Sequence, residues 1–234
     1  IASNQFECTG GLCYAPQGRI HLTGNQPTYT ASFLAERVKV DSNQPEIGPP
    51  ADLYVPVSGD GGEGGGDEGG GGGGECTEYL QWGIWANSET RTNTAWWTGS
   101  GHTVYGGVHS NNEIEIGGAG HRIYGTVEYV SSLNIHGAGN EIIPGPAVQT
   151  GVDDFPVDWD IADFEPGGTY ADAAIAAGKY YTHTSDWNFS GSGATIAEGL
   201  HYCEGDVQIS GAGVNGHLAG VSSDGTIHVS GSGV

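Results

Sequence analysis

A glycine corner of the form Gly-Ser-Gly or Gly-Ala-Gly returns along the chain at a nearly constant interval, and this spacing constrains the fold more than any other feature. The corners begin at Gly99, Gly118, Gly137, Gly191, Gly211 and Gly231. The step from one corner to the next is 19 in the first group of three and 20 in the second. Near the start, IHLTGN at residues 20–25 returns as VKVDSN at residues 38–43, a step of 18. Three regions of the chain therefore share one repeat.

Within each repeat, apolar residues alternate with polar ones in short runs cut by glycine, as at Ile114 and Ile116 and again at Leu133 and Ile135. This period of two indicates strands. Three short strands in every repeat of about 18–20 residues are typical of a solenoid whose coils stack to bury their apolar faces. The sequence predicts an all-β protein: a parallel β-helix (β-solenoid) with three-strand coils, right-handed, plus a short helical excursion.

Two stretches lack the repeat. Residues 48–75 are rich in glycine, proline and acidic residues, a composition typical of a linker; it separates N-terminal coils (1–47) from a main solenoid domain (76–234). Residues 142–187 form a second interruption. Within it, TYADAAIAAGKYY predicts a helix ended by Gly178, packed against the solenoid by Trp159, Phe164 and Tyr170.

The net charge of −22 limits the partners that the chain can have. An acidic protein repels nucleic acid and anionic membrane, while it attracts cations weakly. Apolar runs stay far below the 18 or more residues of a membrane span. We therefore expect neither nucleic-acid binding nor membrane insertion. The first residue is Ile1 and methionine is absent, which suggests a processed or partial chain.

The cysteine count is even, with Cys8, Cys13, Cys76 and Cys203. Their spacing matches no zinc or redox motif, and four cysteines allow three pairings. A Cys8–Cys13 loop together with a Cys76–Cys203 bridge is one of them. A disulfide interpretation implies an oxidising, extracytoplasmic setting.

Candidate metal ligands occur at two places. His102 and His121 hold the same position in successive coils, where two stacked imidazoles could share an ion; a polar ladder at a corner is the alternative, and we favour it. A cluster of carboxylates, Asp153, Asp154, Asp158 and Asp160, could bind a structural Ca²⁺, or could serve helix capping and solvation. We expect no cofactor, with structural Ca²⁺ as the open alternative.

Catalytic signatures are not evident. Glycosidic cleavage needs two facing carboxylates, and the outward residues of the repeat do not converge on such a pair, so we predict that the chain is not an enzyme. Tyr79, Trp82, Trp85, Trp96 and Trp97 cluster before the first glycine corner; they suggest a cap on the solenoid end or a sugar-stacking face. Asn188 begins the single N-glycosylation motif, Asn-Phe-Ser.

Several stretches resemble a known group of bacterial surface proteins. GSGHTVYGGVHSNNEIEIGGAGHRIYG, PVDWDIADFEPGG and the C-terminal GLHYCEGDVQISGAGVNGHLAGVSSDGTIHVSGSG resemble extracytoplasmic regions with HSN and SGSG repeats. GLCYAPQGRIHLTGN and ASFLAERVKVDSN look like the YAP-type repeat of pilus-associated domains. The group is that of proteins associated with tight-adherence (Flp-type) pilus assembly. The resemblance implies an extracytoplasmic β-helix with a structural or adhesive role at the cell surface.

A solenoid end left bare exposes strand edges, which proteins pair or cover. We therefore expect the N-terminal coils to stack on the C-terminal end of a neighbouring copy, a head-to-tail contact that builds a filament. The predicted interface residues are Ile20, Leu22, Val38, Val40, Ile227, Val229 and Val234. The predicted function is that of an extracellular structural subunit of a pilus-like fibre. The alternatives are a monomeric adhesin or carbohydrate-binding stalk with a surface polysaccharide as partner, and a polysaccharide lyase or hydrolase.

Overall fold

A computed structural model describes residues 7–26, 28–48, 82–154, 160–212, 214–223 and 225–232. The chain folds into a β-solenoid of about eight turns built from parallel strands, with one short α-helix, which confirms the predicted fold. The strands are β1 (Glu7–Asn25), β2 (Thr28–Asn43), β3 (Glu46–Gly48), β4 (Trp82–Ala86), β5 (Ala95–Ser100), β6 (Thr103–Tyr105), β7 (Gly107–Ser110), β8 (Glu113–Gly117), β9 (Arg122–Tyr124), β10 (Val127–Tyr129), β11 (Ser132–His136), β12 (Glu141–Ile143), β13 (Val148–Gln149), β14 (Tyr180–His183), β15 (Trp187–Ser190), β16 (Thr195–Cys203), β17 (Val207–Ser210), β18 (Asn215–Ser223) and β19 (Ile227–Ser232). The helices are the 3-10 helix η2 (Ile161–Asp163) and α1 (Thr169–Ala176).

The strand pairing follows the repeat read from the sequence. Ile20 pairs with Val38, a step of 18. Ile114 pairs with Leu133, a step of 19, and residues 207 and 227 pair at a step of 20. Each coil therefore places its strands directly on those of the next, and equivalent side chains form rows along the solenoid axis.

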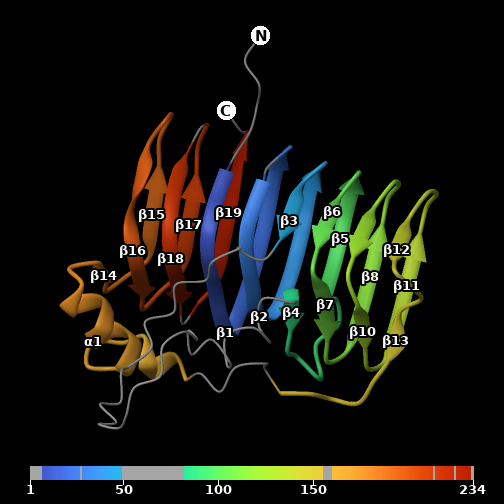
Figure 1. Cartoon of the computed structure of the whole chain (residues 1–234), viewed down its shortest axis with the longest axis horizontal. Helices are drawn as coiled ribbons and strands as arrows, with labels where there is room; N and C mark the ends of the chain where they lie inside the picture. Colours follow the sequence, from blue (N-terminus) through green and yellow to red (C-terminus); the bar gives the residue numbers. More distant parts are fainter. Residues whose placement is uncertain are drawn as a thin grey trace, which may run out of the picture.

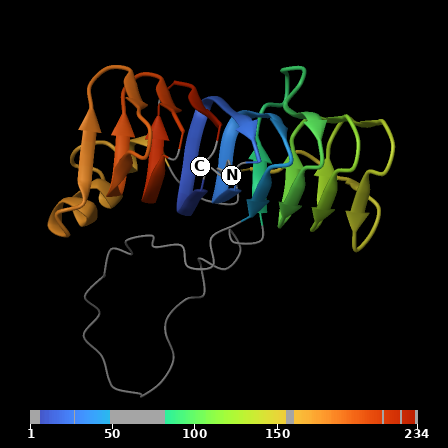
Figure 2. The same cartoon turned by 90° about the horizontal axis from the view of Figure 1, so that it is seen from above.

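The order of the coils in space differs from their order in the chain. The strand β1 pairs with β18 and β19 on one side and with β2 on the other, and β2 pairs in turn with β4 and β5. The N-terminal segment (residues 7–48) thus lies between the C-terminal block (residues 180–232) and the middle block (residues 82–149). Figure 1 shows this order as red, blue and green strands along the axis, and Figure 2 shows it from above.

The predicted N-terminal unit is therefore the centre of one continuous stack. The chain leaves the middle block at one end of the solenoid and re-enters the stack at the other end through β14 (Figure 1). A solenoid read along its axis would run from residue 180 to 232, then from 7 to 149. In effect the molecule is a regular solenoid whose sequence has been permuted, with the join at the contact between β19 and β1.

The main core is built from inward rows that cross all three blocks. One row consists of Trp187, Val207, Ile227, Ile20, Val38, Ala95, Ile114 and Leu133. Its central members are buried, because each has a coil on both sides. Burial of a side chain of this size contributes about 1.5–3 kcal/mol. The hydrophobic rows are the reason that a single coil cannot stand alone.

Glycine is required at the corners because consecutive coils approach closely there. Gly118 has a φ of +121°, which L-residues rarely adopt, and a Cβ at this position would overlap the carbonyl oxygen of Gly99 in the preceding coil. Gly137 repeats the relation with Gly118. The regular return of glycine in the sequence is therefore a packing requirement of the stacked corners.

Residues 150–154 and 160–179, which together we call the strap, lie along the outside of the solenoid (Figure 1). It contains η2 and α1, and Gly178 with φ of +68° follows the helix end, as predicted. The interruption is shorter than the predicted 142–187, because β12, β13, β14 and β15 still pair within the solenoid.

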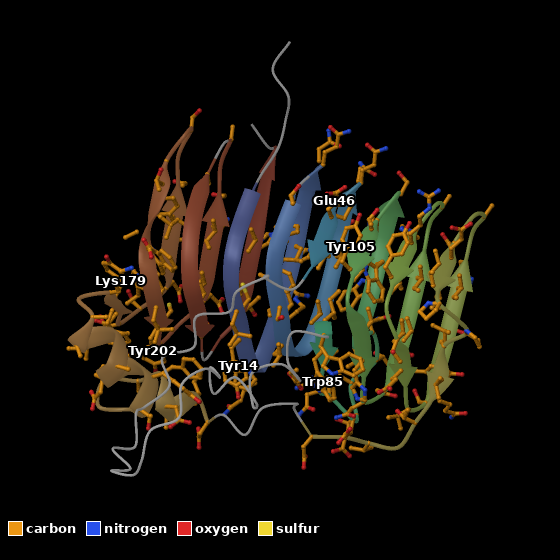
Figure 3. The ribbon with its side chains drawn as sticks, in the orientation of Figure 1. Tyr14, Glu46, Trp85, Tyr105, Lys179 and Tyr202 are labelled. Atoms are coloured by element: carbon orange, nitrogen blue, oxygen red, sulfur yellow. The ribbon has the colours of Figure 1, made fainter. Side chains whose placement is uncertain are left out.

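A second hydrophobic cluster lies between the strap and the outer face of the solenoid. It joins Leu12, Tyr14, Leu34, Trp82, Trp85, Phe164, Ala174, Leu200 and Tyr202. The ring of Phe164 packs against Tyr14 at 5.4 Å and Tyr170 at 5.2 Å between centroids. Figure 3 shows Tyr202, Tyr14 and Trp85 along this side of the stack. The predicted packing by Phe164 and Tyr170 is confirmed, and Trp159 lies outside the described residues.

Candidate functional site

The two ends of the solenoid are the places where the repeat is left incomplete. At one end, each of β11, β12 and β13 pairs with a strand on one side only among the described residues. At the other end the same holds for β14 and β15. Both ends therefore carry backbone N–H and C=O groups directed away from the stack. Such strand edges are the positions at which a further strand can pair.

Side chains of the inward rows emerge at these ends. At the β11–β13 end, Ile135 belongs to a core row but is 43% exposed, because no coil of the described chain covers it. At the β14–β15 end, the inward residues are aromatic: the rings of His183 and Trp187 stack at 4.2 Å, and those of Trp187 and His201 at 4.7 Å. Each end thus presents an apolar surface framed by strand edges.

The rows also show which residues would meet if one copy continued another. Extending the register by one coil places Leu133 opposite Trp187, Asn134 opposite Asn188 and Ile135 opposite Phe189. Apolar residues would face apolar ones, and an amide would face an amide. Stacked amides of this kind hydrogen-bond along a ladder. The rows of β11 and β15 are therefore chemically matched, while on the neighbouring face β13 pairs with β10 and holds the position that β14 of a further copy would take.

The predicted assembly residues are paired within one chain. Ile20 pairs with Ile227 and Leu22 with Val229 inside the same molecule. Their other neighbours, Val38 and Val40, pair with Ala95 and Trp97 of the middle block. Val234 lies outside the described residues. Contact between copies through these residues stays a prediction. Within one chain, the described members of these rows already have a neighbouring coil on both sides.

His102 and His121 form a buried ladder that satisfies backbone groups. Nδ1 of His121 accepts the His102 backbone N–H at 3.2 Å, and Oδ1 of Asn140 accepts the His121 backbone N–H at 3.0 Å. On the opposite side, Nε2 of His102 donates to the carbonyl of Ser42 at 2.7 Å. Nε2 of His121 lies 3.2 Å from the Gly117 carbonyl, so three of the four ring nitrogens of the pair are used in corner hydrogen bonds. The polar-ladder alternative describes these residues, although they are buried rather than at the surface.

Nδ1 of His102 has no hydrogen-bond partner among the described residues, although the residue is only 1% exposed. The register explains why. Thr103 pairs with Glu46, so the residue beneath His102 is Pro45. Proline has no backbone N–H to donate. Burial lowers the pKa of His102 to about 4.

Asp153 and Asp160, two members of the predicted carboxylate cluster, make separate contacts in the strap. The side chain of Asp160 caps η2 by accepting the Ala162 backbone N–H at 3.1 Å. Asp153 is fixed by its backbone, which exchanges two hydrogen bonds with the side chain of Asn111. Asp158 lies outside the described residues. Within the described ranges, no three His, Cys, Asp or Glu side chains gather as a metal site.

The network around Asn111 attaches the strap to the middle block. Nε2 of His109 donates to Oδ1 of Asn111 at 2.9 Å, and Nδ1 lies 3.2 Å from the Glu128 carboxylate. The fully buried ring of His109 stacks on Trp85 at 3.8 Å. The imidazole is enclosed by protein, while the Glu128 side chain is 26% exposed. The hydrogen bond from His109 holds Asn111 against the backbone of Asp153.

Disulfide bonds are absent among the described residues, contrary to the expectation from the cysteine count. Cys203 is a fully buried thiol that donates to the carbonyl of Ser185 at 3.3 Å, so the suggested Cys76–Cys203 bridge is not formed. Burial raises the pKa of this thiol. Cys13 pairs with Val221, two coils from Cys203, which is beyond the Cα separation of a disulfide. The side chains of Cys8 and Cys76 lie outside the described residues.

The tryptophans do not form one surface. Trp97 belongs to the main core, while Trp82 and Trp85 point into the second cluster under the strap. Lys39 lies over the ring of Trp96 at 5.5 Å. The predicted end cap is therefore wrong, because β4 and β5 have coils on both sides. Tyr79 lies outside the described residues.

An exposed aromatic strip was missed from the sequence. Tyr105 is 48% exposed and Tyr124 is 38% exposed, and their rings stack at 5.4 Å. Beside them, Arg122 forms an ion pair with Glu141 at 3.4 Å. Figure 3 shows Tyr105 near Glu46 on the same face. The sequence signal for this pair is that tyrosine recurs at the same position in two successive repeats, as Tyr105 and Tyr124.

Asn188, the candidate glycosylation residue, is exposed on β15 at the end of the stack.

Comparison with known proteins gave no match to a family model, a curated protein or a solved structure. None of the described helices is long and apolar enough to cross a membrane.

Proposed function

We propose that the protein is an extracellular structural subunit that assembles head-to-tail into a surface filament. The observation that supports this most is the match between the two solenoid ends, where Leu133, Asn134 and Ile135 complete rows that begin at Trp187, Asn188 and Phe189. The contact is between β11 of one copy and β15 of the next, and it requires β13 to leave β10 so that β14 of the next copy can pair there. A heterologous contact of this kind does not close on itself, so it adds subunits along one axis.

The charge of the protein sets the conditions for this assembly. With a net charge of −22, two copies repel each other at low ionic strength. Salt at about 0.1 M reduces the screening length to about 10 Å. We therefore expect assembly to strengthen as salt is raised. The same charge keeps the free subunit soluble.

The test is the replacement Ile135→Asp, which puts a charge on the apolar end without cutting into a covered part of the core. The control is Tyr105→Asp, an equally exposed change on the side of the solenoid. Negative-stain imaging and light scattering at about 0.5 M salt should show fibres for the wild type and the control, and monomers for Ile135→Asp. X-ray diffraction of oriented fibres should give a spacing of about 4.8 Å along the fibre axis. A wild-type protein that stays monomeric at high concentration overturns the proposal.

We propose glycan binding by the strip of Tyr105 and Tyr124 as a second function, in keeping with the adhesin alternative. Two exposed aromatic side chains beside an ion pair offer apolar contact and hydrogen bonds together, as sugar surfaces require. Affinity electrophoresis through gels containing neutral or acidic polysaccharides tests this. Retardation that is lost in Tyr105→Ala/Tyr124→Ala supports binding, and equal mobility in every gel excludes it for those glycans.

A further inference from the structure

The corner between β3 and β4 is far longer than its equivalents in neighbouring coils. The strands β3 and β6 pair with each other, as do β4 and β7, so the β3–β4 and β6–β7 connections make the same turn. A single residue, Gly106, makes that turn in the second case. In the first case the whole stretch 49–81 lies between the two strands. The turn itself does not require this length.

The length gives the N-terminal segment a reach well beyond its own coil. A chain as long as residues 49–81 spans at most about 110 Å when extended. Residues 49–81 carry an unbroken glycine run at positions 69–74 among acidic residues. By its length alone, the connection allows the N-terminal segment to reach the equivalent space in a second copy of the chain.

The N-terminal segment is held by ladders that any copy of the chain could supply. On one side β1 pairs with β19 over six consecutive residues, from Ile20–Ile227 to Asn25–Ser232. On the other side β2 pairs with β5 over six, from Val38–Ala95 to Asn43–Ser100. The same pairs would form if the segment came from a second copy. The choice between the two arrangements then depends on protein concentration against the effective concentration of the tether, on the order of mM.

We propose that the N-terminal segment (residues 7–48) exchanges between copies, so that the segment of one chain fills the space between the C-terminal and middle blocks of another. The partner is a second copy of this chain. Reciprocal exchange closes a dimer, while one-way exchange links successive copies into an open chain. This contact uses a different part of the molecule from the solenoid ends, so it stands or fails independently of the filament proposal.

The strap favours this route over exchange of the C-terminal block. The strap is fastened to the rest of the solenoid at two places: Asn111 binds the backbone of Asp153, and Phe164 packs under Tyr14. It moves with the C-terminal block, because the Phe164 carbonyl accepts the hydroxyl of Tyr180 in β14 at 2.6 Å. Release of the C-terminal block would break both attachments. Release of the N-terminal segment leaves the attachment at Asp153 in place.

Full-length chains that each carry one new cysteine test the exchange. His21 and His228 pair across the first contact, and Asp41 and Thr98 pair across the second. Neighbouring strands lie about 4.8 Å apart, which suits a disulfide. Chains with His21→Cys are mixed with chains with His228→Cys, unfolded, and refolded together at about 10 μM or about 1 mM before oxidation. A second mixture combines Asp41→Cys with Thr98→Cys. Linked peptides are identified by mass spectrometry.

Both mixtures should form interchain disulfides, with at least a tenfold larger yield at the higher concentration. The negative control mixes Gln208→Cys with His228→Cys, which are neighbours inside the C-terminal block and should stay unlinked between chains. The double variant His21→Cys/His228→Cys in one chain should close an intrachain bond at about 10 μM, which shows that the replacements fold. If that bond forms but neither mixture links at about 1 mM, the proposal is overturned. Links in the first mixture alone would assign the exchange to the C-terminal block and also overturn it.

Discussion

The buried histidine ladder should make the protein sensitive to acid, and His102 is the residue with which to measure it. In the folded protein Nε2 of this residue donates to the Ser42 carbonyl, and the ring is almost fully buried. Burial lowers its pKa from the ordinary 6.5 to about 4. The perturbation is His102→Asn, because Asn140 already holds the equivalent position two coils away and donates to the equivalent carbonyl of Gly118 at 3.3 Å.

The sign of the effect follows from proton binding. Between pH 6.5 and about 4 the unfolded chain protonates this histidine and the folded chain does not. Stability is therefore fully present above pH 6.5 and is lost as the pH falls through this window. One pKa unit corresponds to about 1.4 kcal/mol, so the full loss from His102 is about 3 kcal/mol. At pH 5 the loss is about 2 kcal/mol.

Burial lowers the pKa of five further histidines in the same direction: His21, His121, His183, His201 and His228. The wild type should therefore lose more stability on acidification than His102 alone explains. His102→Asn should remove about 2 kcal/mol of the loss between pH 7.5 and pH 5. The free energy of unfolding in urea at the two pH values measures this. The exposed His136→Asn serves as the control variant. A His102→Asn protein that loses as much stability as the wild type would refute the reasoning.

Four other expectations concern stability and reactivity. Gly118→Ala should cost about 2–4 kcal/mol because its Cβ meets backbone, whereas Gly120→Ala, with positive φ but open space, should cost about 1 kcal/mol; thermal unfolding compares the two. Ile114→Ala should cost about 2–5 kcal/mol in chemical denaturation, as expected for a fully buried core residue. The thiol of Cys203 should react with iodoacetamide only after unfolding, and labelling of the native protein would contradict its burial. Asn111→Ala should cost about 1–3 kcal/mol and speed proteolysis of the strap, which limited digestion would detect.

The repeat could be read from the sequence because each element of it is local. A strand of alternating apolar residues, such as Ile114 and Ile116, and a glycine corner, such as that at Gly118, depend on residues within one coil and its neighbour. The helix ended by Gly178 was readable for the same reason. Periodicity then supplied the register, since equivalent residues must stack.

The candidate sites were less readable, because they depend on which coil lies next to which. The aromatic residues around Trp85 are typical of an end cap, yet coils from another part of the chain cover them. The cysteines suggested a bridge, yet the fold places Cys203 as a buried thiol in the core. The exposed pair Tyr105 and Tyr124 follows the repeat, but its exposure depends on the face that the strap leaves open.

The sequence by itself determined the architecture: parallel coils with a regular repeat, glycine corners, an apolar interior and a short helical interruption. Only the tertiary structure decided the order of the coils, which puts residues 7–48 in the centre and leaves β11–β13 and β14–β15 as the ends. The physical reason is that every coil offers nearly the same ladder and the same apolar rows to a neighbour. Local chemistry therefore specifies that coils stack, while the choice of neighbour depends on the strap, the long connection and the fit of whole blocks.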